Sequence, residues 1–357
     1  MRQLRLSISG FGTVGRWLAA AVHRRHAWLA AECGVAISVV SVATRRDGFI
    51  HRDSGLDVPT LLDLTAAGRP LTNYPGARRW DTALEGLAQT ERDVLAEASN
   101  TNPREPEPAL SHIRQTLERG THVITSSKGA CAAAALELVA LALRHGVQFR
   151  MESTVMSGTP VISTIREGLA GTRVVAVRGI LNGTANHILT LMAEDRAYPV
   201  ALADAQAQGY AEPDPTDDVE GHDVVAKVRI LAATAFGRAV PLDHVIRRGI
   251  TGITPEAIQQ AARDGCRIKL VASVRLQPTG DGAELASTPL EARVEPVALP
   301  LTDPLARVDG VLNALTIETD TVRAVTIIGP GAGPEQAGQG IFADLVTIAR
   351  AGGHRPA

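Results

Sequence analysis

The sequence predicts an α/β protein in which a doubly wound parallel sheet is followed by a second, mixed α+β domain. Three observations support this fold class. The first 150 residues alternate short apolar runs with longer helical patterns, as β-α-β units do. After about residue 155 this alternation gives way to a less regular order of strands and helices. The length of 357 residues suits two domains of roughly 100 to 200 residues each.

The first domain is expected to consist of parallel strands connected by helices. Strands are predicted at residues 6–9, 36–43, 93–98, 122–125 and 147–151, and helices at 13–31, 108–119 and 130–144. These helices are long enough for parallel crossovers, which are right-handed in nearly all sheets. Residues 50–90 are rich in turn formers and are expected to be less regular.

The second domain is expected to mix strands and helices. Strands are predicted at residues 174–181, 268–275, 292–295, 314–319 and 322–328, and helices at 185–195, 200–208 and 219–236, the last of which Gly221 can interrupt. A final helix at 334–350 is expected to return to the first domain. The predicted division is therefore 1–153 with 330–357 for dinucleotide binding, and 154–329 for catalysis and dimerisation.

Composition excludes several classes of protein. Lys and Arg number 36 against 38 Asp and Glu, so the net charge of −2 gives no reason to expect a nucleic-acid partner. The 3 cysteines, Cys33, Cys131 and Cys266, form no CxxC or Cys/His cluster, which argues against a disulfide framework or a zinc site. Neither a signal peptide nor an apolar run of about 18 residues is present. We expect a cytoplasmic protein with no membrane partner.

A glycine-rich turn follows the first predicted strand and opens the first helix. Its GxGxxG spacing permits a tight turn and a close approach of the backbone to a pyrophosphate at the helix N-terminus. This context predicts a Rossmann-type dinucleotide site, and a purely structural glycine turn is the alternative. The predicted cofactor-binding residues here are Gly10, Phe11, Gly12, Thr13, Val14 and Gly15.

The end of the second predicted strand indicates which dinucleotide is preferred. An acidic residue is typical there when the adenosine ribose carries a free 2′-hydroxyl. Arg45 and Arg46 occupy this position instead, and guanidinium groups suit a 2′-phosphate. The sequence therefore favours NADP(H) over NAD(H), although a solvated surface pair of arginines is the alternative.

The segment from Gly209 to Lys227 carries most of the predicted chemistry. Pro213 and Pro215 prevent a regular helix, so Glu212 is expected on a loop. Asp223 and Lys227 are four residues apart and share a face of a helix, where the carboxylate can orient the ammonium. The neighbours of this pair are apolar, which indicates a buried helix, and buried charges need partners.

At this point the sequence resembles a known family, the homoserine dehydrogenases. The pattern that carries the resemblance is Ala205-x-x-x-Gly209-Tyr210-Ala211-x-x-Asp214-Pro215-x-x-Asp218-Val219-x-Gly221-x-Asp223-x-x-x-Lys227. Further similar segments lie at residues 10–15, 125–129, 152–160, 178–184 and 329–333. The resemblance covers almost the whole chain, in order.

The resemblance implies NAD(P)H-dependent interconversion of L-aspartate 4-semialdehyde and L-homoserine by a homodimer. It makes Lys227 and Lys128 the candidate proton donor and electrostatic stabiliser, with Asp223 orienting Lys227. It further implies that Glu212 binds the substrate α-ammonium and that Lys128 and Gly331 belong to the cofactor site. The remaining substrate-pocket residues that it implies are Gly183, Thr184, Tyr210 and Asp218.

The resemblance also implies a sodium site formed largely by backbone carbonyls. The residues at the positions of the family's ligands are Glu152, Val155, Ser157 and Thr159. Met156 stands where the family usually has a small residue, so a positive φ there would strain the backbone. A simple hinge between the domains is the alternative interpretation.

Other departures concern single positions and the end of the chain. Ser127 replaces a usual Asn before Lys128, and Gln336 replaces a usual Thr. Because the sequence ends at Ala357, feedback through a C-terminal regulatory domain is not expected. Two rival functions remain: a dehydrogenase of another small amino-acid semialdehyde, and a catalytically silent NADP-binding sensor.

Overall fold

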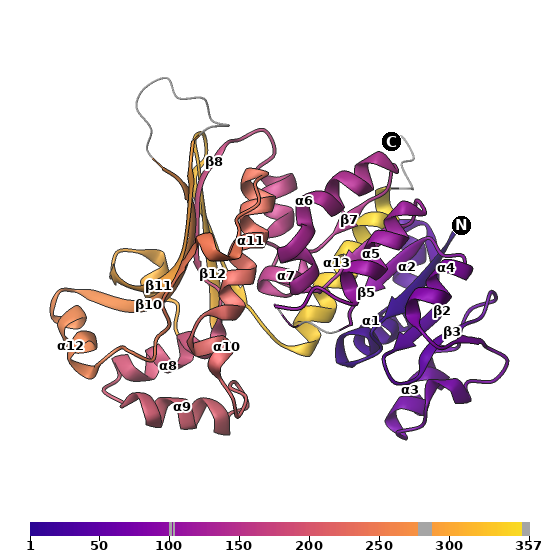
Figure 1. Ribbon diagram of the computed structural model, residues 1–357, viewed down its shortest axis with the longest axis horizontal. Helices are drawn as coiled ribbons and strands as arrows, with labels where there is room; N and C mark the ends of the chain where they lie inside the picture. Colours follow the sequence, from indigo (N-terminus) through magenta and orange to yellow (C-terminus); the bar gives the residue numbers. More distant parts are fainter. Residues whose placement is uncertain (100–101, 103, 278–287, 352–357) are drawn as a thin grey trace. The chain divides into compact units, whose positions relative to one another are not determined.

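The computed structural model describes residues 1–99, 102, 104–277 and 288–351 and divides the chain into two compact units (Figure 1). The first unit comprises Met1–Gly158 and Gly333–Ala357, and the second comprises Thr159–Ala332. The first unit extends beyond the expected boundary at residue 153 because α7 (Ser153–Met156) packs against α13 (Pro334–Ala351). The Oγ of Ser153 donates a hydrogen bond of 2.9 Å to the carbonyl of Ala337.

The first unit is built around a 7-stranded sheet with the order β4-β3-β2-β1-β5-β6-β7. The parallel strands are β1 (Arg2–Ser9), β2 (Val35–Thr44), β5 (Val94–Glu97), β6 (His122–Thr125) and β7 (Phe149–Arg150). β3 (Gly48–His51) and β4 (Arg78–Trp80) extend the sheet in antiparallel fashion. The doubly wound parallel core is therefore confirmed.

The helices of the first unit differ in part from expectation. They are α1 (Thr13–Arg24), α2 (His26–Cys33), α3 (Val58–Ala66), α4 (Ala83–Gln89), α5 (Ala109–Glu118), α6 (Lys128–Arg144), α7 and α13. The prediction of one helix over 13–31 was wrong, because Arg25 leaves helical geometry at φ −101°, ψ 16°. Residues 50–90, expected to be less regular, contain the short elements α3, β4 and α4.

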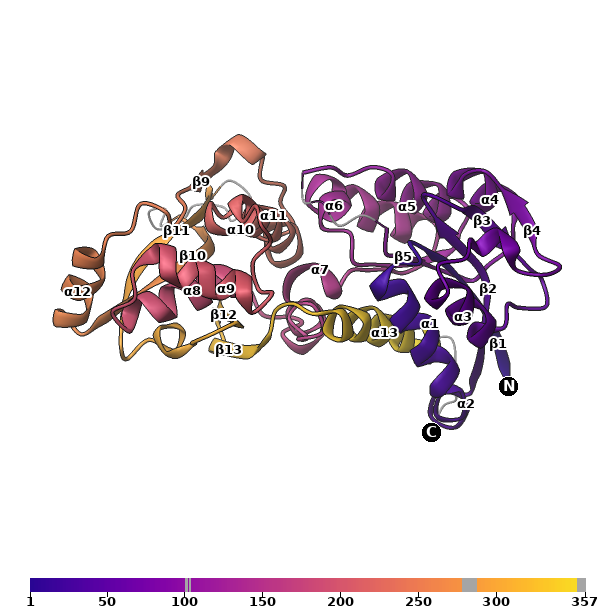
Figure 2. The ribbon, with the colours of Figure 1, turned by 90° about the horizontal axis from the view of Figure 1, so that it is seen from below.

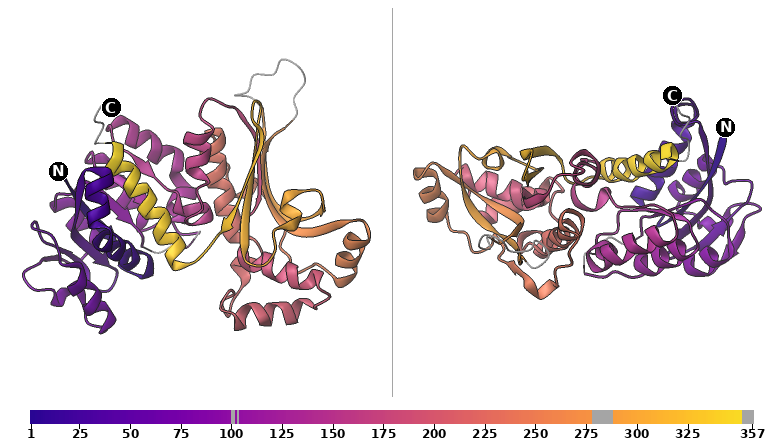
Figure 3. Two further views of the ribbon diagram at one scale, coloured as in Figure 1. Left: turned by 180° about the vertical axis from the view of Figure 1, so that it is seen from behind. Right: turned by 90° about the horizontal axis from the view of Figure 1, so that it is seen from above.

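One hydrophobic core of the first unit lies between the sheet and the pair α1 and α13, which run side by side in Figures 2 and 3. Leu6 and Ile8 of β1, Leu18 of α1, and Ile341 and Leu345 of α13 are fully buried in this core. Burying a side chain of this size stabilises a fold by about 1.5 to 3 kcal/mol. The final helix thus packs into the core of the first unit.

The second unit contains a 6-stranded mixed sheet with the order β13-β12-β8-β10-β11-β9. Its strands are β8 (Val174–Ile180), β9 (Val245–Arg247), β10 (Cys266–Leu276), β11 (Leu290–Pro300), β12 (Leu312–Thr319) and β13 (Arg323–Pro330). Among the described strands of this second sheet, only β9 and β11 pair in parallel. The short strand β9 has no distinctive sequence pattern and was not predicted.

Helices cover the second sheet and carry most of the predicted substrate residues. They are α8 (Gly183–Ala193), α9 (Tyr198–Ala207), α10 (Thr216–Val219), α11 (His222–Phe236) and α12 (Pro255–Arg263), of which α8 and α9 lie together in Figure 1. Gly221 separates α10 from α11 with a φ of +77°, a left-handed conformation that favours glycine. The expected interruption of the 219–236 helix therefore occurs at Gly221. No helix in the described ranges is long and apolar enough to cross a membrane.

Candidate active site

The glycine-rich turn lies at the carboxyl end of β1, directly beside β5. Gly10 has a φ of +89°, and a Cβ built on it would lie 2.2 Å from the carbonyl carbon of Ala98. Only glycine fits this position, because a Cβ would overlap the backbone that follows β5. The N–H groups of Gly10 and Phe11 both donate to the carbonyl of Ala43 at 3.0 Å. The turn is therefore fixed against both neighbours of β1.

The turn leads directly into the first turn of α1. Gly12 is the N-cap residue, no side chain caps the helix, and its first turn contains no acidic residue. Thr13 is exposed and Val14 is partly exposed. The first N–H groups of a helix have no intrahelical acceptors and carry partial positive charge, so this end suits the phosphates of a dinucleotide.

The two arginines predicted to bind a 2′-phosphate follow β2 and are exposed. Arg46 Nε contacts Asp47 Oδ1 at 3.0 Å, and this bond raises the pKa of the Arg46 guanidinium. The Asp47 side chain is only 6% exposed and also accepts from the N–H of Leu71. Asp47 therefore holds one arginine in the turn between β2 and β3, a relationship that the sequence reading did not include.

Lys128 is the first residue of α6 and is partly exposed. Ser127 is the N-cap, and its Oγ accepts from the N–H of Ala130 at 3.5 Å. The N–H of Ser127 in turn donates to Thr125 Oγ1 at 3.0 Å. A serine at the usual asparagine position thus still supports the loop before Lys128.

The residues predicted to bind sodium are divided between the two units. Glu152, Val155 and Ser157 belong to the first unit and Thr159 to the second, and all four are buried. The positive φ of this segment occurs at Ser157 (φ 52°), whereas Met156 is helical. The strain that the sequence suggested at Met156 is therefore found one residue later.

The surroundings of Glu152 are rich in buried charge. Its N–H donates to Asp344 Oδ2 at 2.8 Å, and Arg150 Nε lies 3.3 Å from Asp344 Oδ1. Burial raises the pKa of Asp344 to about 7. No group of at least 3 His, Cys, Asp or Glu side chains among the described residues is arranged to hold a metal ion, so any cation here would depend on backbone carbonyls.

Asp223 and Lys227 form a buried ion pair on α11. Lys227 Nζ lies 2.8 Å from Asp223 Oδ2 and donates a 2.5 Å hydrogen bond to the carbonyl of Leu181, directly after β8. Lys227 is 6% and Asp223 9% exposed. The pairing expected from the i,i+4 spacing therefore forms, and the Leu181 carbonyl gives the ammonium a second fixed contact.

Asn182 connects this pair to Asp218. Its Nδ2 donates to Asp218 Oδ1 at 2.7 Å and lies 3.5 Å from Asp223 Oδ2, while its Oδ1 accepts from the N–H of Ala185 as the cap of α8. The bend at Gly221 brings Asp218 and Asp223 to the same amide group. Asn182 was not among the predicted site residues, although an Asn before Gly-Thr at the start of a helix is a recognisable N-cap signal.

The other predicted substrate residues lie near the start of α8 and the loop after α9. Thr184 Oγ1 donates to the carbonyl of Tyr210 at 2.6 Å, and Tyr210 is 44% exposed and stacks edge-on against His187. Gly183 approaches Val311 closely, with an ideal Cβ 2.7 Å from its carbonyl oxygen. Glu212 lies on the exposed loop that the flanking prolines predict.

Gly331, the remaining residue predicted to bind the cofactor, lies in the second unit. An ideal Cβ on Gly331 would lie 1.9 Å from Nδ2 of Asn313, so a side chain has no space there. Asn313 is 1% exposed and lies on β12.

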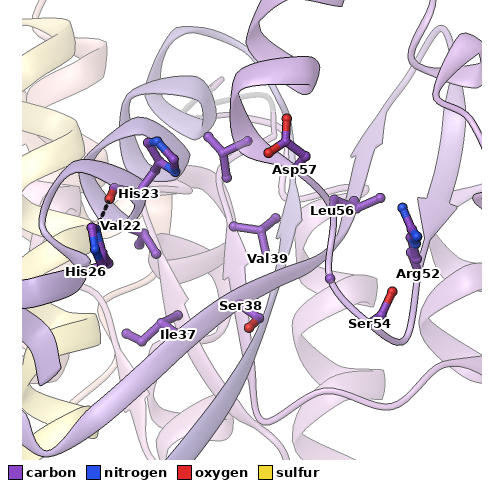
Figure 4. A pocket seen from close by; sticks show the side chains of 12 residues that line it. Val22, His23, His26, Ile37, Ser38, Val39, Arg52, Ser54, Leu56 and Asp57 are labelled. Carbon is purple, nitrogen blue, oxygen red and sulfur yellow. Dashed lines mark hydrogen bonds between the residues drawn. The ribbon is translucent and has the colours of Figure 1, made fainter.

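A pocket of about 430 Å³ lies elsewhere in the first unit, between the end of α1, β2 and the start of α3 (Figure 4). Apolar side chains such as Val22 and Val39 line it together with His23, His26 and Arg52. It contains none of the predicted catalytic or cofactor residues. The pocket is therefore distinct from the glycine-rich turn, which begins α1 at its other end.

Comparisons with known proteins agree with this geometry. A family model described as the homoserine dehydrogenase NAD-binding domain matches residues 10–152, and one described as homoserine dehydrogenase matches 160–346. A protein from Pseudomonas canavaninivorans described as NAD(+)-dependent homoserine dehydrogenase is 37% identical over 98% of this chain and 97% of its own. A homoserine dehydrogenase from Methanocaldococcus jannaschii is 34% identical, covering 96% and 97% of the two chains.

Solved structures show the same similarity. A putative homoserine dehydrogenase from Archaeoglobus fulgidus superimposes with a TM-score of 0.84 at 34% identity, covering 97% of this chain and 99% of its own. A hyperthermophilic archaeal homoserine dehydrogenase in complex with NADPH gives a TM-score of 0.80 at 27% identity, covering 97% of each chain.

The parallel sheet, the glycine-rich turn and the second mixed sheet define an NAD(P)-dependent oxidoreductase that acts on a CH–OH group. Nearly full-length similarity makes the assignment more specific. The chain belongs to the homoserine dehydrogenase family, whose reaction is the reversible reduction of L-aspartate 4-semialdehyde to L-homoserine.

Proposed function

We propose that this chain reduces L-aspartate 4-semialdehyde with Lys227 as the cation that acts on the aldehyde oxygen. The observation that carries this assignment is the buried pair of Lys227 and Asp223, 2.8 Å apart and anchored to the Leu181 carbonyl. Burying two charges is costly, and apolar residues of similar size often give equal or greater stability. A functional need for a fixed ammonium explains why the pair is present.

The positive charge of the ammonium is complementary to the negative charge that develops during the reaction. When bound, the nicotinamide supplies a hydride to the aldehyde carbon. Negative charge then grows on the aldehyde oxygen, which a fixed cation stabilises and to which it donates a proton. Lys227 and Lys128 are the two candidates for these roles, and Asp223 positions Lys227.

The remaining predicted residues bind and orient the substrate. Glu212 supplies a carboxylate for the substrate α-ammonium from its exposed loop. Asp218 is held by Asn182 near the ion pair, and Tyr210 and Thr184 are joined by a 2.6 Å hydrogen bond. Gly183 lets the start of α8 approach Val311 closely. Together these groups suit a small zwitterionic substrate.

Two exposed arginines support NADPH as the preferred cofactor. Arg45 and Arg46 provide positive charge at the turn after β2, and the bond to Asp47 fixes the position of Arg46. A guanidinium recognises a phosphate through charge-assisted hydrogen bonds, and the 2′-phosphate is the group that distinguishes NADPH from NADH. Gly331 is proposed as a further cofactor contact.

A sodium ion fits the segment at residues 152–159. The positive φ of Ser157 redirects the backbone there, and the carboxylates of Glu152 and Asp344 lie in the same buried region as Arg150. The carbonyls of Glu152, Val155 and Ser157, with Thr159, would hold the ion. The role of the ion would be structural, because a monovalent cation bound by carbonyls fixes the backbone around it.

The second sheet is the proposed site of homodimer formation. β13 is paired on one side only, by β12, and therefore forms an edge of the described sheet. Ile328 on this strand is 52% exposed. An edge strand with exposed apolar residues readily pairs with a second chain.

The experiment that tests the assignment follows NADPH absorbance with L-aspartate 4-semialdehyde, and in the reverse direction compares homoserine with other amino alcohols. Faster turnover of homoserine supports the assigned substrate. Faster turnover of another amino alcohol supports a different semialdehyde. NADPH binding without turnover of any of them would instead indicate a silent sensor.

A further inference from the structure

A buried acid and histidine lie beneath the glycine-rich turn and have no role in the reaction described above. Glu97, the last residue of β5, is 0% exposed, and His112 on α5 is 6% exposed. His112 Nδ1 lies 2.7 Å from Glu97 Oε2 and 3.1 Å from Ser9 Oγ, at the end of β1. Nδ1 of His112 is the donor in this bond when Glu97 is ionised, because an ionised carboxylate only accepts hydrogen bonds.

The other carboxylate oxygen of Glu97 holds the chain that follows β5. Glu97 Oε1 accepts from the N–H of Ser99 at 2.9 Å and also from the Ser99 hydroxyl. This fixes the peptide between Ala98 and Ser99. An ideal Cβ on Gly10 would lie 2.3 Å from that same nitrogen of Ser99, so Gly10 packs directly against the peptide that Glu97 holds.

The backbone of Glu97 supports a second cofactor element. Its carbonyl accepts from Thr125 Oγ1 at 2.9 Å and from the N–H of Ser126 at 3.2 Å. Thr125 Oγ1 also accepts from the N–H of Ser127, the residue that caps α6 just before Lys128. One residue therefore links the glycine-rich turn with the loop that presents Lys128.

We propose that Glu97 and His112 are positioning residues for the dinucleotide. The pair fixes the Ala98–Ser99 peptide, this peptide fixes Gly10, and Gly10 sets the turn that receives the pyrophosphate. Neither residue needs to contact the cofactor. The inference depends on cofactor binding by the first unit and not on the roles proposed for Lys227 or the substrate residues.

Electrostatics alone leads to the opposite expectation for a variant at Glu97. A carboxylate beneath a pyrophosphate repels it, so its removal would tighten binding if charge were the dominant effect. The contact with His112 at 2.7 Å and the hydrogen bonds from Ser99 all depend on the carboxylate itself. Positioning therefore predicts weaker binding in Glu97→Gln, because an amide cannot accept at both of its terminal atoms.

The test is a fluorescence titration of the full-length protein with NADPH, with no substrate present. Glu97→Gln and His112→Gln are the main variants, and Ser9→Ala is a milder third one that only removes a hydroxyl. Asp93→Asn is the matched control, because Asp93, just before β5, also contacts β1, through Arg5 at 2.9 Å, but at the opposite end of β5 from Glu97. Thermal unfolding of every variant separates loss of stability from loss of binding.

Glu97→Gln and His112→Gln are expected to raise the Kd for NADPH about tenfold, the effect of losing one charge-assisted hydrogen bond. At saturating NADPH their kcat stays within about twofold of the wild type, because the chemistry is unaffected. Should Glu97→Gln not fold, His112→Gln and Ser9→Ala decide the question. Unchanged or tighter NADPH binding in the folded variants, or equal weakening in Asp93→Asn, would overturn the proposal.

Discussion

The ammonium of Lys227 is held between two fixed oxygens, Asp223 Oδ2 at 2.8 Å and the carbonyl of Leu181 at 2.5 Å. One contact comes from the same helix and the other from the residue after β8. These two contacts fix the direction of the amine, which the flexible four-carbon side chain of a lysine would not do by itself. This arrangement suits an ammonium that acts on a single substrate oxygen.

Asn182 is expected to maintain this arrangement through Asp218 and Asp223. In Asn182→Ala the two carboxylates lose their common amide donor and α8 loses its cap. We expect kcat/KM for the semialdehyde to fall about tenfold or more, with an additional stability loss of about 1 kcal/mol from the missing cap. Asn182→Ser keeps a capping oxygen. The Asn182→Ser variant should therefore regain the stability but not the activity. Recovery of both would contradict the role of Asn182 in joining Asp218 to Asp223.

Glu212 is expected to control substrate affinity. Glu212→Gln removes the carboxylate proposed for the α-ammonium, so the KM for the semialdehyde should rise about 10- to 100-fold while the KM for NADPH stays unchanged. Asp217→Asn, a nearby exposed acid on α10, is the control. Steady-state kinetics with each reactant varied separately provides the measurement. An equal effect of the two variants would show that only the general negative charge matters.

Arg45 and Arg46 are expected to distinguish the two cofactors. Replacing both with alanine should raise the KM for NADPH about tenfold or more and change that for NADH by less than about twofold. Arg24→Ala, at the far end of α1, is the control for a loss of surface charge. Parallel steady-state assays with NADPH and with NADH measure the two KM values. Similar losses for NADPH and NADH would remove the 2′-phosphate assignment.

Asp309 is expected to make the second unit sensitive to acid. Burial acts to raise the pKa of Asp309, but hydrogen bonds from Arg267 and Lys269 outweigh it and hold the pKa below its usual value. A carboxyl whose pKa is lower in the folded state stabilises the fold above its unfolded pKa of about 4. This stability is lost as the pH falls through the folded pKa.

Thermal unfolding between about pH 3 and 7 tests this expectation. Asp309→Asn should have a lower Tm than the wild type at neutral pH, and the difference should shrink as the pH falls below about 4. Asp243→Asn, at an exposed acid in the same unit, is the comparison. A constant difference in Tm across the pH range would contradict the role of Asp309 ionisation.

Homodimer formation through β13 is expected to depend on Ile328. Ile328→Lys places a charge on the exposed edge strand and should shift the protein from dimer to monomer in light scattering after size exclusion. Val200→Lys is the control, because Val200 is equally exposed, at 53%, on α9. Monomeric wild-type protein, or a dimer that survives Ile328→Lys, would exclude this surface.

Local patterns predicted the parts of the structure that depend on neighbouring residues. The turn at Gly10, the interruption at Gly221 and the pairing of Asp223 with Lys227 all follow from short spacings. These features are encoded within a few residues, so one sequence is sufficient to find them.

Features that depend on distant contacts could not be predicted in this way. The pairing of Glu97 with His112 and the contact of Lys227 with Leu181 join residues that only the folded sheets bring together. The end of α1 before Arg25 also has no glycine or proline to signal it, and the Arg25 guanidinium lies 4.9 Å from the ring of Phe342 near the end of the chain. Tertiary contacts therefore decide what local propensity leaves open.

The most direct test of the central claim compares wild type and Lys227→Ala by the loss of NADPH absorbance at saturating aspartate semialdehyde. The wild type is predicted to oxidise NADPH, and the folded variant to have a kcat lower by roughly 10² to 10⁴-fold with little change in NADPH affinity. Circular dichroism establishes that the variant is folded. A folded Lys227→Ala protein with near wild-type turnover would contradict the account.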